Sequence, residues 1–170
     1  MARILRYGVG ALALGCVVLL TGGCSAVSSS HAQTRQPASD SLSIKSQRAR
    51  YLVIAGEANR KIGPMMNKLP TLMRTDIAGS DADMWAIAAS ERLFDSRLLR
   101  IRFSPGVEPI ARQLYSANQS RAAITANSAD AVSFQELRHD KLRLLQANAP
   151  LEAAVRAIRK KLGLPPPSTS

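Results

Sequence analysis

The sequence of 170 residues contains few cysteines and few aromatic side chains. Both cysteines, Cys16 and Cys24, lie in the first 24 residues, so the rest of the chain can hold neither a disulfide framework nor a cysteine-based zinc site. Phe, Trp and Tyr make up 4% of the chain, whereas all apolar residues together make up 46%, which predicts an aliphatic core. Such a composition favours helices over sheets.

Histidine is as scarce as cysteine, which limits the catalytic chemistry open to the chain. Only His31 and His139 could supply an imidazole, and His31 lies in a polar stretch with no partner nearby in sequence. A serine triad would have to use His139, which lies among charged residues of a helical pattern. His139 is therefore predicted to be a structural or surface residue, and we expect no enzyme activity.

The metal-binding patterns in the sequence are incomplete. Glu136 and His139 have the Glu-x-x-His spacing of di-iron bundles, but a second such pair is missing. The pair His139-Asp140 lacks the further histidines and aspartates that phosphohydrolase metal sites need. Carboxylates also stand four residues apart at Glu91 and Asp95, and a glycine-rich phosphate loop is absent. We expect neither a metal nor another cofactor.

The apolar run over residues 8–20 is too short to span a bilayer comfortably, which takes about 20 residues. It follows Arg3 and Arg6, and no acidic residue occurs before Asp40. A short basic segment before an apolar run of this length is typical of an export signal. Residues 1–23 are therefore predicted to be a signal peptide.

The segment LTGGC, residues 20–24, follows this run and resembles the lipobox of bacterial lipoproteins. The resemblance implies that diacylglycerol is attached to the sulfur of Cys24 and that the chain is cut between Gly23 and Cys24. Thr21 stands where leucine is usual in that motif. Cys16 is a second candidate for lipidation, and secretion with an unmodified thiol is the third reading.

Lipidation at Cys24 would bring two acyl chains, which are enough for stable membrane attachment. Residues 24–42 then form the lipidated cysteine and a tether, because this stretch is rich in Ser, Ala and Gln and lacks a hydrophobic period. We expect a lipid-anchored protein on the extracytoplasmic face of the cell membrane, or on an outer membrane where the host has one.

Apolar residues recur at helical spacing over residues 43–164, and no useful length of this region alternates with period two. The pattern predicts an all-α domain, an antiparallel four-helix bundle, followed by a disordered tail over residues 165–170. The first helix is expected to begin near Ser43, to be kinked or interrupted at Gly63-Pro64, and to end no later than Pro70.

The second predicted helix begins at a capping box of Ser80 with Asp83 and carries Arg97, Arg100 and Arg102 in its last turns. A turn over residues 104–106 separates it from a third helix over residues 108–127.

The fourth predicted helix covers residues 131–162 and contains Pro150. This proline either kinks one helix or divides it into two, with Asn148 as the second N-cap, and we favour one kinked helix. Gly163 is expected to cap its end. The ending RAIR, residues 156–159, with LGLPPP after it, resembles small helical lipoproteins of actinobacteria, a resemblance that implies no particular activity.

Basic residues outnumber acidic residues by 23 to 12, which gives a formal net charge of +11. Such a surplus indicates either an anionic partner or a merely solvated basic surface. Nucleic acid is disfavoured because neither stacking aromatic residues nor a known binding module is visible. The candidate contacts for an anionic partner are Arg97, Arg100, Arg102, Arg156, Arg159 and Lys160.

We therefore expect a membrane-anchored, non-enzymatic envelope lipoprotein that presents a basic helical bundle to an envelope protein, to anionic lipid or to an anionic wall polymer. The alternative is a carrier or sensor that binds a small apolar ligand between the helices. Its pocket would be lined by Met65, Met66, Leu98 and Leu114 and would need several hundred cubic ångströms.

Overall fold

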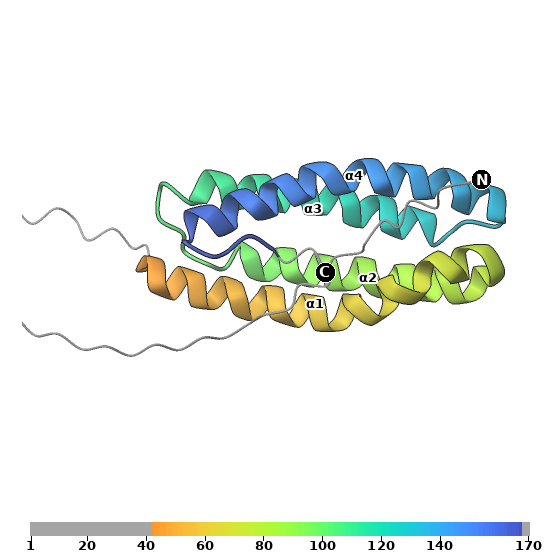
Figure 1. Cartoon of the computed structure of the whole chain (residues 1–170), viewed down its shortest axis with the longest axis horizontal. Coiled ribbons are helices and arrows are strands. Elements are labelled where there is room, and N and C mark those ends of the chain that lie inside the picture. Colours follow the sequence, from red (N-terminus) through yellow and green to blue (C-terminus); the bar gives the residue numbers. More distant parts are fainter. Residues whose placement is uncertain (1–41, 168–170) are drawn as a thin grey trace, which may run out of the picture.

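The computed structural model describes residues 42–167, and these form four α-helices with no strand among them. The helices are α1 (Ile44–Thr75), α2 (Ile77–Leu98), α3 (Glu108–Ser128) and α4 (Phe134–Lys161). The prediction of an all-α antiparallel bundle is confirmed (Figure 1). The predicted signal peptide, Cys24 and all of the predicted tether except Leu42 lie outside the described residues. No helix in residues 42–167 combines the length and apolarity needed to cross a membrane.

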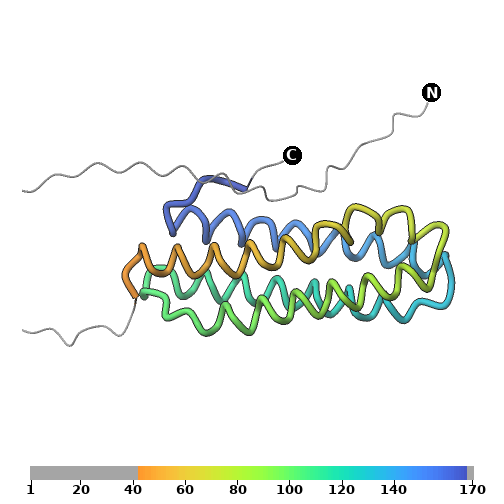
Figure 2. The backbone as a smooth tube through the Cα atoms, turned by 90° about the horizontal axis from the view of Figure 1, so that it is seen from below, coloured from red at the N-terminus to blue at the C-terminus, as the bar shows by residue number. Residues whose placement is uncertain are grey.

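Helices that follow one another in the chain pack side by side, whereas α1 and α4 contact each other only sparsely (Figures 1 and 2). The bundle has two ends. We call the end at the left of Figure 1 the proximal end and define it as residues 43–53, 97–112 and 154–164. The distal end comprises residues 66–85 and 122–142. The chain enters the bundle at the proximal end.

Helix α1 is longer than the sequence predicts, because it continues through Pro64 and Pro70 to Thr75. The prediction that it ends by Pro70 is wrong. Both prolines are exposed to solvent, so their rings face away from the core. Leu69 and Met73, in the same stretch of α1, are buried in the core. Their burial outweighs the backbone hydrogen bonds that the prolines remove.

Helix α2 begins earlier than predicted, and the capping box of Ser80 with Asp83 is not formed. Asp76 is the N-cap, and its Oδ1 accepts a hydrogen bond from the Gly79 N–H at 2.9 Å. Gly79 suits this cap because a Cβ there would lie 2.3 Å from Asp76 Oδ2. Ser80 and Asp83 are instead buried within the helix, where Asp83 lies 3.0 Å from Lys68 Nζ.

Helix α2 also ends earlier than predicted, at Leu98. Arg97 is in its last turn, whereas Arg100 and Arg102 lie in the connection to α3. The third helix starts at the predicted residue and ends one residue later than predicted, at Ser128.

Helix α4 is a single helix that contains Pro150, as favoured from the sequence, and Asn148 lies inside it instead of capping a second helix. Its end is capped as predicted. Gly163 has a φ of 64° and its N–H donates to Lys160 O, while the Leu164 N–H donates to Arg159 O. These two bonds form a Schellman motif, which a glycine favours because of its positive φ.

The core consists of two apolar clusters, one at each end of the bundle. The proximal cluster includes Leu98, Leu114 and Ile158, and the distal cluster includes Met84 and Leu137; all five side chains are fully buried. Between the clusters, α2 and α3 bury polar side chains against each other. Packing therefore holds each end of the bundle separately.

Candidate functional site

The proximal and distal ends of the bundle carry very different charges. Eleven basic side chains and one acidic side chain, Glu108, lie at the proximal end. The distal end has four basic and six acidic side chains. The basic side chains of the proximal end are Lys45, Arg48, Arg50, Arg97, Arg100, Arg102, Arg112, Arg156, Arg159, Lys160 and Lys161. The antiparallel topology gathers them from three separate segments.

Hydrogen bonds join the entering chain to the α2–α3 connection. The Leu42 N–H donates to Arg102 O at 3.2 Å. Gln47, which is 1% exposed, donates from Nε2 to Leu42 O and accepts at Oε1 from the Ser104 N–H at 3.3 Å. The buried amide of Gln47 thus fixes the point where the chain enters beside the connection that carries Arg100 and Arg102.

The end of α4 is joined to the same surface. The Arg48 guanidinium donates to Gly163 O. Arg159 is 6% exposed, and its Nε donates to Pro165 O at 2.7 Å. It lies near the buried Tyr51, whose pKa is raised to about 12 by burial. Arg159 was a predicted contact for an anionic partner, and its burial removes it from the exposed basic surface.

The other predicted contacts differ in how they are paired. Arg97 forms an ion pair with Glu57 across α1 and α2, and Arg156 lies 3.5 Å from Glu152 within α4. Arg100 and Lys160 are exposed and have no carboxylate partner among the described residues. Arg102 is exposed and accepts the hydrogen bond from Leu42 at its carbonyl.

The predicted contacts leave out five basic residues of this end. Two of them, Arg48 and Arg112, bond to Gly163 O and to Glu108, and the other three are Lys45, Arg50 and Lys161. All three are exposed and have no carboxylate partner within residues 42–167. The topology predicted from the sequence could have identified them. In an antiparallel four-helix bundle the start of the first helix and the end of the fourth necessarily meet at one end, together with the second connection.

Three large apolar side chains of the proximal end are exposed, Ile44, Val53 and Leu99, and two of them stand next to cations in the sequence. Leu99 is 56% exposed and stands between Arg97 and Arg100 in the sequence, and Ile44 is 50% exposed and precedes Lys45. The proximal end therefore combines positive charge with exposed aliphatic surface.

No protein-family model, curated protein or solved structure matches this chain. The chemistry of the site must therefore be inferred from its own residues.

The Glu136 and His139 pair does not assemble into a metal site. Glu136 Oε2 accepts from the Val132 N–H at 2.7 Å, and the Glu136 N–H donates to Ser133 Oγ at 3.2 Å, so Glu136 caps α4. His139 has a side chain 75% exposed, 3.7 Å from Asp140. In the part of the chain that the structure describes, no three His, Cys, Asp or Glu side chains are grouped to hold a metal ion.

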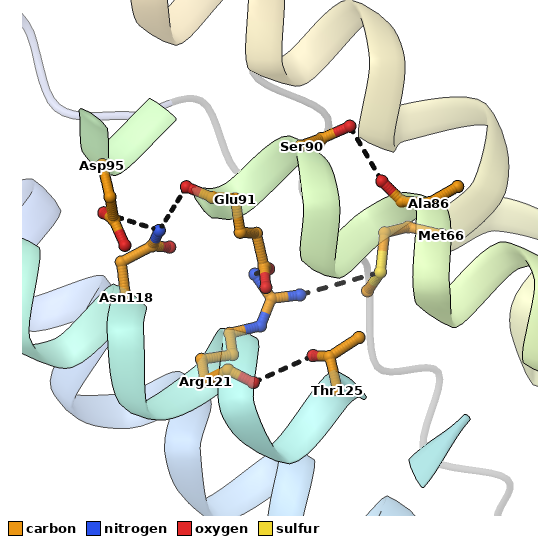
Figure 3. Close-up of polar contacts among 8 residues, drawn as sticks. All are labelled: Met66, Ala86, Ser90, Glu91, Asp95, Asn118, Arg121 and Thr125. Carbon is orange, nitrogen blue, oxygen red and sulfur yellow. Dashed lines mark hydrogen bonds and ion pairs between the residues drawn. The ribbon is translucent and has the colours of Figure 1, made fainter. Parts of the chain in front are cut away.

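The carboxylates of Glu91 and Asp95 belong to a buried polar layer between the two apolar clusters (Figure 3). Arg121 Nη1 lies 2.7 Å from Glu91 Oε1, and Arg121 Nη2 points to the sulfur of Met66. Asn118 Nδ2 donates to Asp95 Oδ1 at 2.9 Å and to Glu91 O at 3.2 Å. Burial raises the pKa of Glu91 to about 7 and that of Asp95 to about 6. The layer links α2 to α3.

The four residues proposed to line an apolar pocket are not brought together. Leu98 and Leu114 belong to the proximal cluster, whereas Met65 and Met66 pack against the distal cluster. Hollows of about 10 and about 20 Å³ lie beside Phe94 and Leu98. Both are far smaller than a typical ligand pocket of roughly 300–1,000 Å³.

Proposed function

We propose that the chain is a lipid-anchored, non-enzymatic envelope lipoprotein whose helical bundle presents its proximal end to an anionic partner. One observation carries this proposal: eleven cations lie at the end of the bundle that the segment following Cys24 enters, and three of them, Arg97, Arg112 and Arg156, are paired with carboxylates. Opposite charges attract over about a Debye length, which is near 8 Å at physiological ionic strength. The partner must therefore come close to this end.

The distance from the proposed anchor supports this orientation. Seventeen residues of the predicted tether lie between Cys24 and Leu42. A flexible Ser-rich chain of that length has a root-mean-square span of roughly 25 Å. Helix α4 has 28 residues and so extends about 40 Å at 1.5 Å per residue. The anchor would thus hold the proximal end at a distance of roughly 25 Å from the membrane, which is shorter than the bundle itself.

Metabolic labelling with a fatty acid tests the anchor, using Cys24→Ala and Cys16→Ala as a matched pair. Neither cysteine lies in the bundle, so both variants should give the same helical circular dichroism as the wild type. We expect Cys24→Ala to lose the label and its retention in the membrane fraction, and Cys16→Ala to keep both. Labelling that follows Cys16, or a wild-type protein that takes up no label, would contradict the proposal.

A further inference from the structure

We infer that the anionic partner of the proximal end is the phospholipid surface itself, on which the bundle docks end-on with Leu99 and Ile44 entering the headgroup region. This inference rests on the proposed lipid anchor at Cys24. It goes further because it names the partner and the orientation of the bundle.

The proximal end has positive charges that are available to bind an anionic surface. Five exposed cations of the proximal end have no carboxylate partner among the described residues. They are Lys45, Arg50, Arg100, Lys160 and Lys161. Clustered cations held next to an anionic leaflet are attracted to it, and the attraction falls off within a Debye length. A tethered end satisfies that condition of closeness.

Helix dipoles do not account for this charge. Lys160 and Lys161 suit the C-terminus of α4, where cations are favoured. Lys45, however, lies in the first turn of α1, where acidic residues are favoured, and that turn contains none. Because cations lie both at the start of α1 and at the end of α4, the stability of the individual helices does not explain them. Binding by this surface does.

Exposed aliphatic side chains favour a bilayer over a water-soluble anionic polymer as the partner. Leu99 and Ile44 are each at least half exposed and stand next to cations in the sequence. Aliphatic side chains surrounded by Lys and Arg are typical of surfaces that enter the membrane interface. A hydrated polymer would use the cations but would leave these two side chains in water.

The acidic residues of the distal end oppose the reverse orientation, although Trp85, Val132 and Phe134 are exposed there. Asp76, Asp81 and Asp130 lie near one another there, and the pKa of Asp81 is raised by burial and by its two acidic neighbours, although its hydrogen bond with Ser80 lowers it. An anionic leaflet repels such an end. The competing orientation is a bundle lying on α4, where Leu142 is 60% exposed beside Lys141 and Arg143.

Tryptophan fluorescence distinguishes these orientations, because Trp85 is the only tryptophan in the chain. The lipidated protein is reconstituted in vesicles whose phospholipids carry bromine near the headgroup, with either phosphatidylglycerol or phosphatidylcholine. One reporter is the native Trp85, which is 46% exposed on α2. Two others are Leu99→Trp and Leu142→Trp in a Trp85→Phe background, and both replaced leucines are exposed, so the core is unchanged.

We expect Leu99→Trp to be quenched roughly threefold more strongly in phosphatidylglycerol than in phosphatidylcholine vesicles. Trp85 and Leu142→Trp should be quenched in neither. Adding the triple change of Arg100, Lys160 and Lys161 to Ala should abolish the quenching of Leu99→Trp. The matched triple change of Arg74, Arg138 and Lys141 to Ala removes the same charge from the distal end and should leave the quenching intact.

Failure of the anchor is detected separately, because an unanchored protein does not float with the vesicles. A protein that floats but shows no quenching of Leu99→Trp, or equal quenching in both lipids, overturns the docking inference. Quenching of Leu142→Trp in its place would show the bundle lying on α4 and would also overturn it. Retention on cell-wall fragments that depends on the proximal triple, without quenching, would identify a wall polymer as the partner instead.

Discussion

The proximal end of the bundle carries eleven basic side chains and one acidic one, whereas the distal end carries four basic and six acidic ones. The two ends are nevertheless built on the same principle, since each closes around its own buried aliphatic cluster. A fold held by apolar packing does not require this difference in charge. The difference therefore indicates what each end meets outside the molecule.

The charged residues of the two ends also differ in their structural roles. At the distal end, Asp76 and Glu136 cap helices and Asp83 pairs with Lys68. At the proximal end, Arg100 and Lys160 have no such partner in the described chain. Several distal carboxylates therefore stabilise the fold, while five proximal cations remain available for binding.

The largest expected effects test whether the ends are packed alike. Leu114 and Leu137 are both completely buried, one in each cluster. We expect Leu114→Ala and Leu137→Ala each to lower the free energy of unfolding by about 4 kcal/mol, because each leaves a cavity. Urea denaturation followed by circular dichroism measures both. A cost below about 1 kcal/mol at one end only would show that the ends are packed differently.

The next effect tests the difference in charge. In a chain of residues 24–170 with Cys24→Ser, changing Arg100, Lys160 and Lys161 to Ala should weaken partitioning onto phosphatidylglycerol vesicles roughly 100-fold, at about 1 kcal/mol per cation. The distal triple of Arg74, Arg138 and Lys141 should lower it only slightly. Cosedimentation measures the partitioning. Equal losses for the two triples would mean that net charge matters and its position does not.

A smaller effect concerns the polar layer between the ends. The folded chain holds the Glu91 proton up to about pH 7, whereas the carboxyl group of the unfolded chain titrates near 4.5. The stability that this proton contributes is complete below the lower value and is lost as the pH rises through the higher one. The free energy of unfolding should fall by about 2 kcal/mol between pH 5 and pH 8.

The matched variant for this pH dependence is Glu91→Gln, which removes the titrating group but keeps the size of the side chain. Its free energy of unfolding should change less with pH than that of the wild type, the remainder coming from Asp95. Denaturant unfolding at a series of pH values measures the slope. An unchanged slope would show that Glu91 does not titrate differently in the folded chain.

The smallest expected effect concerns two glycines of the proximal end. Gly163→Ala should lower the free energy of unfolding by about 1 kcal/mol, because its φ of 64° is strained for a residue with a Cβ. Gly106→Ala should change it little, since Gly106 lacks a positive φ and a Cβ there meets nothing within 4 Å. Thermal unfolding compares the two. Equal costs would contradict a specific role for the turn that ends α4.

The four helices and their order follow from the apolar periodicity, and the structure confirms them. Their ends were harder to predict, because Leu69 and Met73 extend α1 beyond Pro70 through contacts with the rest of the bundle. Several Ser and Asp residues near the start of α2 could act as its cap. Only the fold shows that Asp76 does so while Ser80 is buried.

The candidate site was predicted in part. The sequence groups Arg97, Arg100 and Arg102 because they are close together in the chain. The topology brings Lys45 and Arg50, from the start of α1, to the same end of the bundle. Grouping by sequence could not reveal that Arg159 is buried, because that burial depends on residues after Gly163 turning back over α4.

Thiol reactivity of the membrane-bound protein tests most directly whether the proximal end faces the bilayer. Gly106→Cys places a thiol on the exposed tip of the proximal end, and Ala78→Cys places one on the distal end. With a membrane-impermeant maleimide, Gly106→Cys should react roughly tenfold more slowly than Ala78→Cys on phosphatidylglycerol vesicles, and at a similar rate on phosphatidylcholine vesicles. Equal rates for the two variants on phosphatidylglycerol vesicles would contradict docking of the proximal end on the bilayer.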